Sequence, residues 1–145
     1  METVSDSKAI QLDNEYRRDL YKLLSECYYL PDAGLVNKLN NLDASGAGYC
    51  ANIGKYCPKI EDIDSLAIDY TKLFVGPYGL LAPPYGSLYL DASDRIMGDS
   101  TMDVRNRYAE EGLDICLKEA PDHIAIEMEF MYFLIFKEIE AINNN

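Results

Sequence analysis

Residues 121–139 read PDHIAIEMEFMYFLIFKEI, and this stretch decides the fold class. One set of apolar residues recurs at the three- and four-residue spacing of a helix: Ile124, Ala125, Met128, Met131, Tyr132, Ile135 and Ile139. Pro121 suits the first position of that helix. Phe130 and Phe133 are among the residues that make the other side apolar too, and a helix that is apolar nearly all round must be buried on most sides. We expect chain beyond residue 145, or a second copy, to cover it.

Upstream of this stretch the chain shows helical spacing and no strand pattern. The predicted helices span residues 13–29, 32–42, 61–74 and, weakly, 49–56, with a further one capped by Ser100 or Thr101 and ending near Gly112. We predict an all-α fold. Residues 1–120 would form an N-terminal helical domain, and residues 121–145 the first helix of a truncated or swapped C-terminal part.

Between the predicted helices, residues 77–99 are rich in proline and glycine and have no helical period. Their tyrosines and leucines make the segment too apolar for a solvated linker. Long loops inside compact domains are usually functional. The run from Pro83 to Tyr89 combines a fixed proline backbone with tyrosines that offer apolar faces and a hydrogen-bonding tip. Such a run lines a peptide groove or simply covers the helices.

The charge balance restricts the partners. The 145 residues include 25 Asp and Glu against 13 Lys and Arg, for a net charge of −12. Nucleic acids and anionic membranes attract basic proteins, so neither is expected as a partner, whereas cationic partners are favoured. The chain has no basic, apolar signal peptide and no apolar run of the roughly 20 residues that span a membrane. We therefore predict a cytoplasmic protein without membrane insertion.

The residues that carry chemistry are few. One histidine and four cysteines without a C-x-x-C pair predict neither a metal site nor a bound cofactor. Asp122 and His123 form the sharpest polar pair, a binding anchor or a helix cap. No nucleophile elbow or phosphate-binding glycine loop is present. We predict no enzyme activity; the alternative is a small thiol or nucleotide hydrolase that uses His123 with Cys116.

Four blocks of sequence resemble one protein family, the TorD-type (TorD, DmsD and NarJ) maturation chaperones for redox enzymes. Residues 69–77 (DYTKLFVGP) are similar to the family's Y-x-x-L-F-V-G-P segment, and residues 119–131 (EAPDHIAIEMEFM) to its P-D-H-I/L segment. Between them lie residues 82–90 (APPYGSLYL) and residues 97–101 (MGDST) with Val104, Arg105 and Tyr108. Many members carry Trp where this chain has Tyr85, and members continue through further helices after the segment that matches Phe130 to Ile142.

The resemblance implies a TorD-like helical bundle without enzyme activity. Such chaperones bind the twin-arginine leader of a molybdenum- or tungsten-cofactor oxidoreductase and hold the apoenzyme until its cofactor is inserted. By position, the implied peptide-binding residues are Tyr70, Leu73, Phe74, Pro84, Tyr85, Ser87, Asp122, His123 and Glu127. Domain exchange would also allow a homodimer.

The physics of the residues agrees with this implication. Asp122 and Glu127 are candidate partners for arginine, because carboxylates accept its fork of donors. The peptide-binding hypothesis requires that the run from Pro83 to Tyr89, the proline-tyrosine segment, and the Asp122–His123 pair lie side by side. A third hypothesis, a purely structural or oligomeric fragment without a ligand, stays open.

Overall fold

The computed structural model describes residues 4–42, 57–76, 79, 81–92, 95–115 and 119–144. The regular elements of these residues are all helical, which confirms the all-α prediction. They are α1 (Val4–Cys27), α2 (Ala33–Asn40), α4 (Ile63–Tyr70), the π-helical turn η1 (Thr71–Val75), α5 (Ser87–Leu90), α6 (Asp99–Glu110) and α7 (Ile124–Asn143). The weak helix predicted at 49–56 lies outside the described residues.

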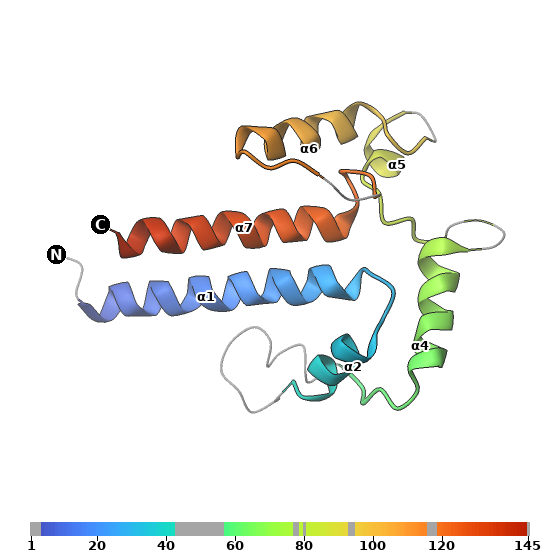
Figure 1. Ribbon diagram of the computed structural model, residues 1–145, viewed down its shortest axis with the longest axis horizontal. Coiled ribbons are helices and arrows are strands. Elements are labelled where there is room, and N and C mark those ends of the chain that lie inside the picture. Colours follow the sequence, from blue (N-terminus) through green and yellow to red (C-terminus); the bar gives the residue numbers. More distant parts are fainter. Residues whose placement is uncertain are drawn as a thin grey trace.

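The centre of the fold is an antiparallel pair of long helices, α1 and α7, with the start of α1 and the end of α7 at the same side of the molecule (Figure 1). Close approach is possible because the contact residues are small: Ser25 donates a hydrogen bond of 2.8 Å to the carbonyl of Ala125, and both residues are buried. Ion pairs of Arg17 with Glu138 and of Lys22 with Glu129 follow the same seam. Because α7 shares this seam with α1, residues from both ends of the chain form one core.

Helix α6 lies on the other side of α7 (Figure 1). The rings of Tyr108 and Phe130 meet edge to face with centroids 4.7 Å apart, and Lys137 pairs with Glu111 at 2.5 Å. The mostly apolar α7 is thus covered from two directions. Phe136 nevertheless keeps 40% of its surface exposed.

The start of α7 corrects one prediction. The helix begins at Ile124, not at Pro121, because the His123 side chain is its cap: Nδ1 accepts a hydrogen bond of 3.1 Å from the Ala125 N–H. Pro121 lies in the preceding turn, where its carbonyl accepts a hydrogen bond from the Tyr108 hydroxyl.

The start of α6 corrects the predicted cap of that helix. Neither Ser100 nor Thr101 is the cap, since α6 begins at Asp99 after Gly98. The cap is supplied from a distance: the carboxylate of Asp91 accepts the Ser100 N–H at 3.3 Å. Gly112, with φ 78°, ends the helix as predicted, in the left-handed conformation that glycine adopts without strain.

The remaining boundaries differ in smaller ways. Helix α1 extends further toward the N-terminus than residues 13–29 and ends at Cys27, while α2 starts after its cap Asp32. The helix predicted at 61–74 is α4 followed by η1, in which the Gly76 N–H bonds to the Thr71 carbonyl at 2.7 Å. The segment predicted as loop, 77–99, contains the short helix α5.

Candidate functional site

Two segments that are far apart in the sequence meet at the N-terminal end of α7. The Ile124 N–H donates to the carbonyl of Pro84 at 2.8 Å, and the Gly86 N–H donates to the carbonyl of Asp122 at 3.0 Å. Tyr85 and His123 form an isolated β-bridge between these bonds. The proline-tyrosine segment and the Asp122–His123 pair therefore lie side by side, as the sequence reading required.

Asp122 lies beneath this junction. Its side chain is 1% exposed, and Oδ2 accepts a hydrogen bond of 2.7 Å from the Ser87 N–H at the start of α5. Burial alone would raise the pKa of Asp122, but the hydrogen bonds of Ser87 and the nearby hydroxyl of Thr101 outweigh burial and hold that pKa below its ordinary value. The ionised carboxylate thus connects α5 and α6 to the start of α7.

His123 is also enclosed, at 4% exposure, between two tyrosine rings. Tyr29 stacks on it with centroids 5.9 Å apart, and Tyr85 meets it edge to face at 5.2 Å. Burial lowers the pKa of His123, against the opposing effect of Glu119 and Asp122. Because Nδ1 accepts the Ala125 N–H, the neutral ring carries its proton on Nε2.

A cleft of about 320 Å³ opens beside this junction. Its walls are Phe74 of η1, Tyr28 at the end of α1 and the segment from Ala82 to Gly86. Glu127, in the first turn of α7, contributes a partly exposed carboxyl group. Burial, and then the charge of Asp122, raise the pKa of Glu127 above its ordinary value. The cleft is therefore apolar on its sides and acidic at one place.

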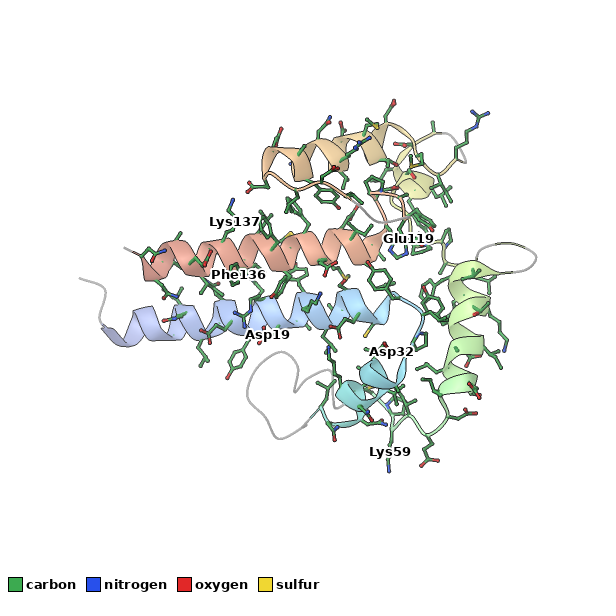
Figure 2. The ribbon with its side chains drawn as sticks, in the orientation of Figure 1. Asp19, Asp32, Lys59, Glu119, Phe136 and Lys137 are labelled. Carbon is green, nitrogen blue, oxygen red and sulfur yellow. The ribbon has the colours of Figure 1, made fainter. Side chains whose placement is uncertain are left out.

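Tyr85 lines the cleft and is hydrogen-bonded to Glu119, which lies outside the cleft lining. Its hydroxyl donates to the Glu119 carboxylate at 3.0 Å, and Figure 2 shows Glu119 near the N-terminal end of α7. Burial and this hydrogen bond raise the pKa of Tyr85 to about 12. Tyr85 thus remains a protonated donor and presents its ring to the cleft.

The predicted site residues fall into three groups. Phe74, Pro84, Tyr85, Asp122 and Glu127 line the cleft. Tyr70 and Leu73 line a neighbouring apolar pocket of about 290 Å³, which also includes Cys27 and Cys57 and shares Phe74 with the cleft. Ser87 and His123 lie beneath the surface and shape the cleft without lining it.

Sequence reasoning missed several lining residues. They are Tyr28, Ala82 and Ile124. Pro83, Gly86 and Tyr89 also line the cleft, and they belong to the run from Pro83 to Tyr89 that the sequence offered as a possible groove lining. Ala82 is next to that run and Ile124 is next to His123, so the same motifs could have supplied them. Tyr28 is different, because it comes from the turn just after α1, and its ring meets Phe74 edge to face with centroids 5.6 Å apart. Its sequence signal is its place among the apolar residues at helical spacing in the helix predicted at 13–29, which indicates core packing.

The hydrolase alternative has no support. The ring nitrogen Nδ1 of His123 caps α7, and Cys116 lies outside the described residues. In the part of the chain that the structure describes, no group of three or more His, Cys, Asp or Glu residues could hold a metal ion. No helix among the same residues is long and apolar enough to cross a membrane.

Comparisons with known proteins agree with the resemblance. The Tat proofreading chaperones DmsD of Salmonella paratyphi A and Salmonella typhi are each 37% identical to this chain over 67 residues, which cover 45% of this chain and 33% of the relatives. The match thus spans about a third of the length of these curated relatives.

A solved structure shows the same fold. It is a crystal structure described as a redox enzyme maturation protein from Archaeoglobus fulgidus, with a TM-score of 0.67 and 28% identity. The similarity covers 81% of this chain and 70% of that one. A family model described as the nitrate reductase delta subunit matches residues 39–145, which are more than half of the chain. The fold and these matches confirm the TorD/DmsD/NarJ resemblance, and the chain belongs to the nitrate reductase delta subunit family.

Proposed function

We propose that this chain is a cytoplasmic chaperone without enzyme activity that serves the maturation of a molybdenum- or tungsten-cofactor oxidoreductase. It would bind the twin-arginine leader or the apoenzyme until the cofactor has been inserted. The observation that carries the proposal is the cleft in which the proline-tyrosine segment meets the start of α7. The relatives support it, since their names are those of a proofreading chaperone and a maturation protein.

The cleft suits such a peptide in chemical character. A twin-arginine leader has two guanidinium groups followed by an apolar stretch. The aromatic and proline walls offer apolar contact, and Glu127 offers a carboxylate. The pocket of Tyr70 and Leu73 continues this apolar surface beyond Phe74. A chain of net charge −12 also attracts a cationic peptide from a distance.

Calorimetric titration of a synthetic twin-arginine leader peptide into the full chain tests the proposal. We expect saturable binding that weakens when both arginines are replaced by glutamine, because the replacement removes the charges that the cleft attracts. Tyr85→Ala should weaken binding as well, since it removes a cleft wall. A chain that binds no leader from any candidate oxidoreductase, yet forms an obligate oligomer in light scattering, would support the ligand-free hypothesis instead.

A further inference from the structure

The two carboxylates of the cleft differ in accessibility. Asp122 is 1% exposed, with Oδ2 bonded to the Ser87 N–H, whereas Glu127 is partly exposed. Asp122 Oδ1 has no hydrogen-bond partner of ordinary geometry among the described residues, although the residue is part of the cleft lining. A ligand can contact Glu127 directly, whereas Asp122 acts on the ligand only through its charge.

The surroundings of Glu127 disfavour its ionised carboxylate in the folded chain. None of the ion pairs formed by the described residues includes it, and the nearby charge that acts on it is the like charge of Asp122. Its place in the first turn of α7 favours a carboxylate. Burial and repulsion still outweigh that effect, because the pKa of Glu127 is raised. Glu127 is thus a carboxylate in an aromatic cleft, and none of the described residues forms an ion pair with it. Its charge is complementary to that of a cationic ligand.

Gly86 leaves room beside this carboxylate. A Cβ atom at Gly86 would lie 3.6 Å from Oε1 of Glu127 and 3.8 Å from the Asp122 carbonyl oxygen, both ordinary contact distances. Its φ of −60° is open to any residue. An added methyl group would therefore fit without unfolding the chain, but it would fill the space that a planar guanidinium needs to approach Oε1.

We propose that Glu127 is the residue that receives an arginine guanidinium of the leader peptide, and that Asp122 positions the cleft without contacting the arginine. This inference rests on the proposed function. The bound cation neutralises Glu127 and relieves its repulsion from Asp122. The rings of Phe74 and Tyr85 give the guanidinium plane an aromatic surface to stack against.

A double-mutant cycle tests the pairing. The probe is a fluorescein-labelled peptide with two adjacent arginines before a leucine- and alanine-rich stretch, compared with versions in which either arginine is glutamine. Glu127→Gln should weaken binding of the parent peptide roughly 10- to 100-fold, as expected for a lost charge-assisted hydrogen bond. It should have little further effect on the peptide that lacks the partner arginine. Glu140→Gln removes the same charge from the far end of α7 and should leave the affinity unchanged.

Thermal unfolding of Glu127→Gln and one further variant, Gly86→Ala, separate this role from a structural one. Glu127→Gln should raise Tm at pH 7 by at least about 1 °C, since it removes a carboxylate that opposes folding. Gly86→Ala should keep Tm and weaken the parent peptide at least about tenfold.

The outcomes distinguish the two proposals. If the unmodified chain does not bind the peptide, the proposed function fails and this inference fails with it. If the chain binds but Glu127→Gln affects all peptides equally, or lowers Tm, the assignment of Glu127 is overturned and the proposed function stands.

Discussion

At the scale of single residues, the Asp122 carboxylate connects three parts of the chain. It accepts the Ser87 N–H and lies near the Thr101 hydroxyl, and its side chain is 1% exposed. Asp122→Ala should lower the free energy of unfolding at pH 7 by about 2–4 kcal/mol, because a buried hydrogen bond to a charged group is lost and the Ser87 N–H is left unsatisfied. Urea unfolding followed by circular dichroism measures this loss.

The pH dependence of that loss checks its origin. Because the pKa of Asp122 is lowered in the folded chain, its contribution to stability is fully present above the ordinary value of 3.8 and disappears as the pH falls through the folded value. The difference between the parent chain and Asp122→Ala should therefore shrink below pH 3.8. A difference that stays constant with pH would show that Asp122 acts through packing and not through its charge.

Single residues also show which features of the site could not be predicted from the sequence. Asp122, His123 and Tyr85 could be selected from the sequence because their types and spacing are informative. Their burial could not. Asp122 is enclosed by α5 and α6, and His123 is covered by Tyr29, which follows α1 and lies far away in the sequence. Accessibility decides which carboxylate can meet a ligand, and it depends on packing between distant segments.

At the scale of elements, the start of α6 depends on a contact across a loop. The Asp91 carboxylate caps the helix, and a Cβ atom at Gly98 would lie 1.8 Å from its Oδ2. Gly98→Ala should destabilise the chain by about 1–3 kcal/mol, since the methyl group must displace the cap. Asp91→Ala alone should cost about 1 kcal/mol, the usual value of a lost cap.

Combining the two changes identifies the mechanism. Once Asp91 is alanine, the methyl group at residue 98 has room, so the double variant should be about as stable as Asp91→Ala alone. Thermal unfolding of all four chains gives this comparison. Additive losses would mean that Gly98 is required for its backbone and not for the space it leaves, contrary to its φ of −90°.

Elements with a long apolar period were predictable, and short or distantly capped ones were not. The apolar residues of α7 and the aspartate caps of α2 and α4 are local signals. Helix α5 has four residues, too few for a period, and its backbone is held by Asp122 from 35 positions further along the chain. The true caps of α6 and α7 were missed for different reasons. Asp91 lies across a loop from α6, whereas His123 directly precedes α7 but histidine is an unusual cap.

At the scale of the whole molecule, the arrangement places the candidate site where three helical segments end. The end of α1, the turn η1 and the start of α7 converge there, and α4 lies across the ends of the α1–α7 pair (Figure 1). The order and spacing of the motifs within 69–131 made the family recognisable. The shape of the cleft followed only from contacts between distant segments, in which the proline-tyrosine segment and η1 meet the start of α7, and for these contacts the sequence has no local signal.

The net charge of −12 leads to a prediction for the whole chain, which rests on the proposed function. Raising NaCl from about 0.01 M to about 1 M shortens the Debye length from about 30 Å to about 3 Å, so it should weaken binding of a twin-arginine peptide at least tenfold. The same salt should leave Tm unchanged or raise it, because screening reduces the repulsion among acidic groups within the folded chain. Fluorescence anisotropy and thermal unfolding in the same buffers separate the two effects. An affinity that does not change with salt would mean that the peptide is held by its apolar stretch alone, and a fall in Tm would attribute weaker binding to unfolding.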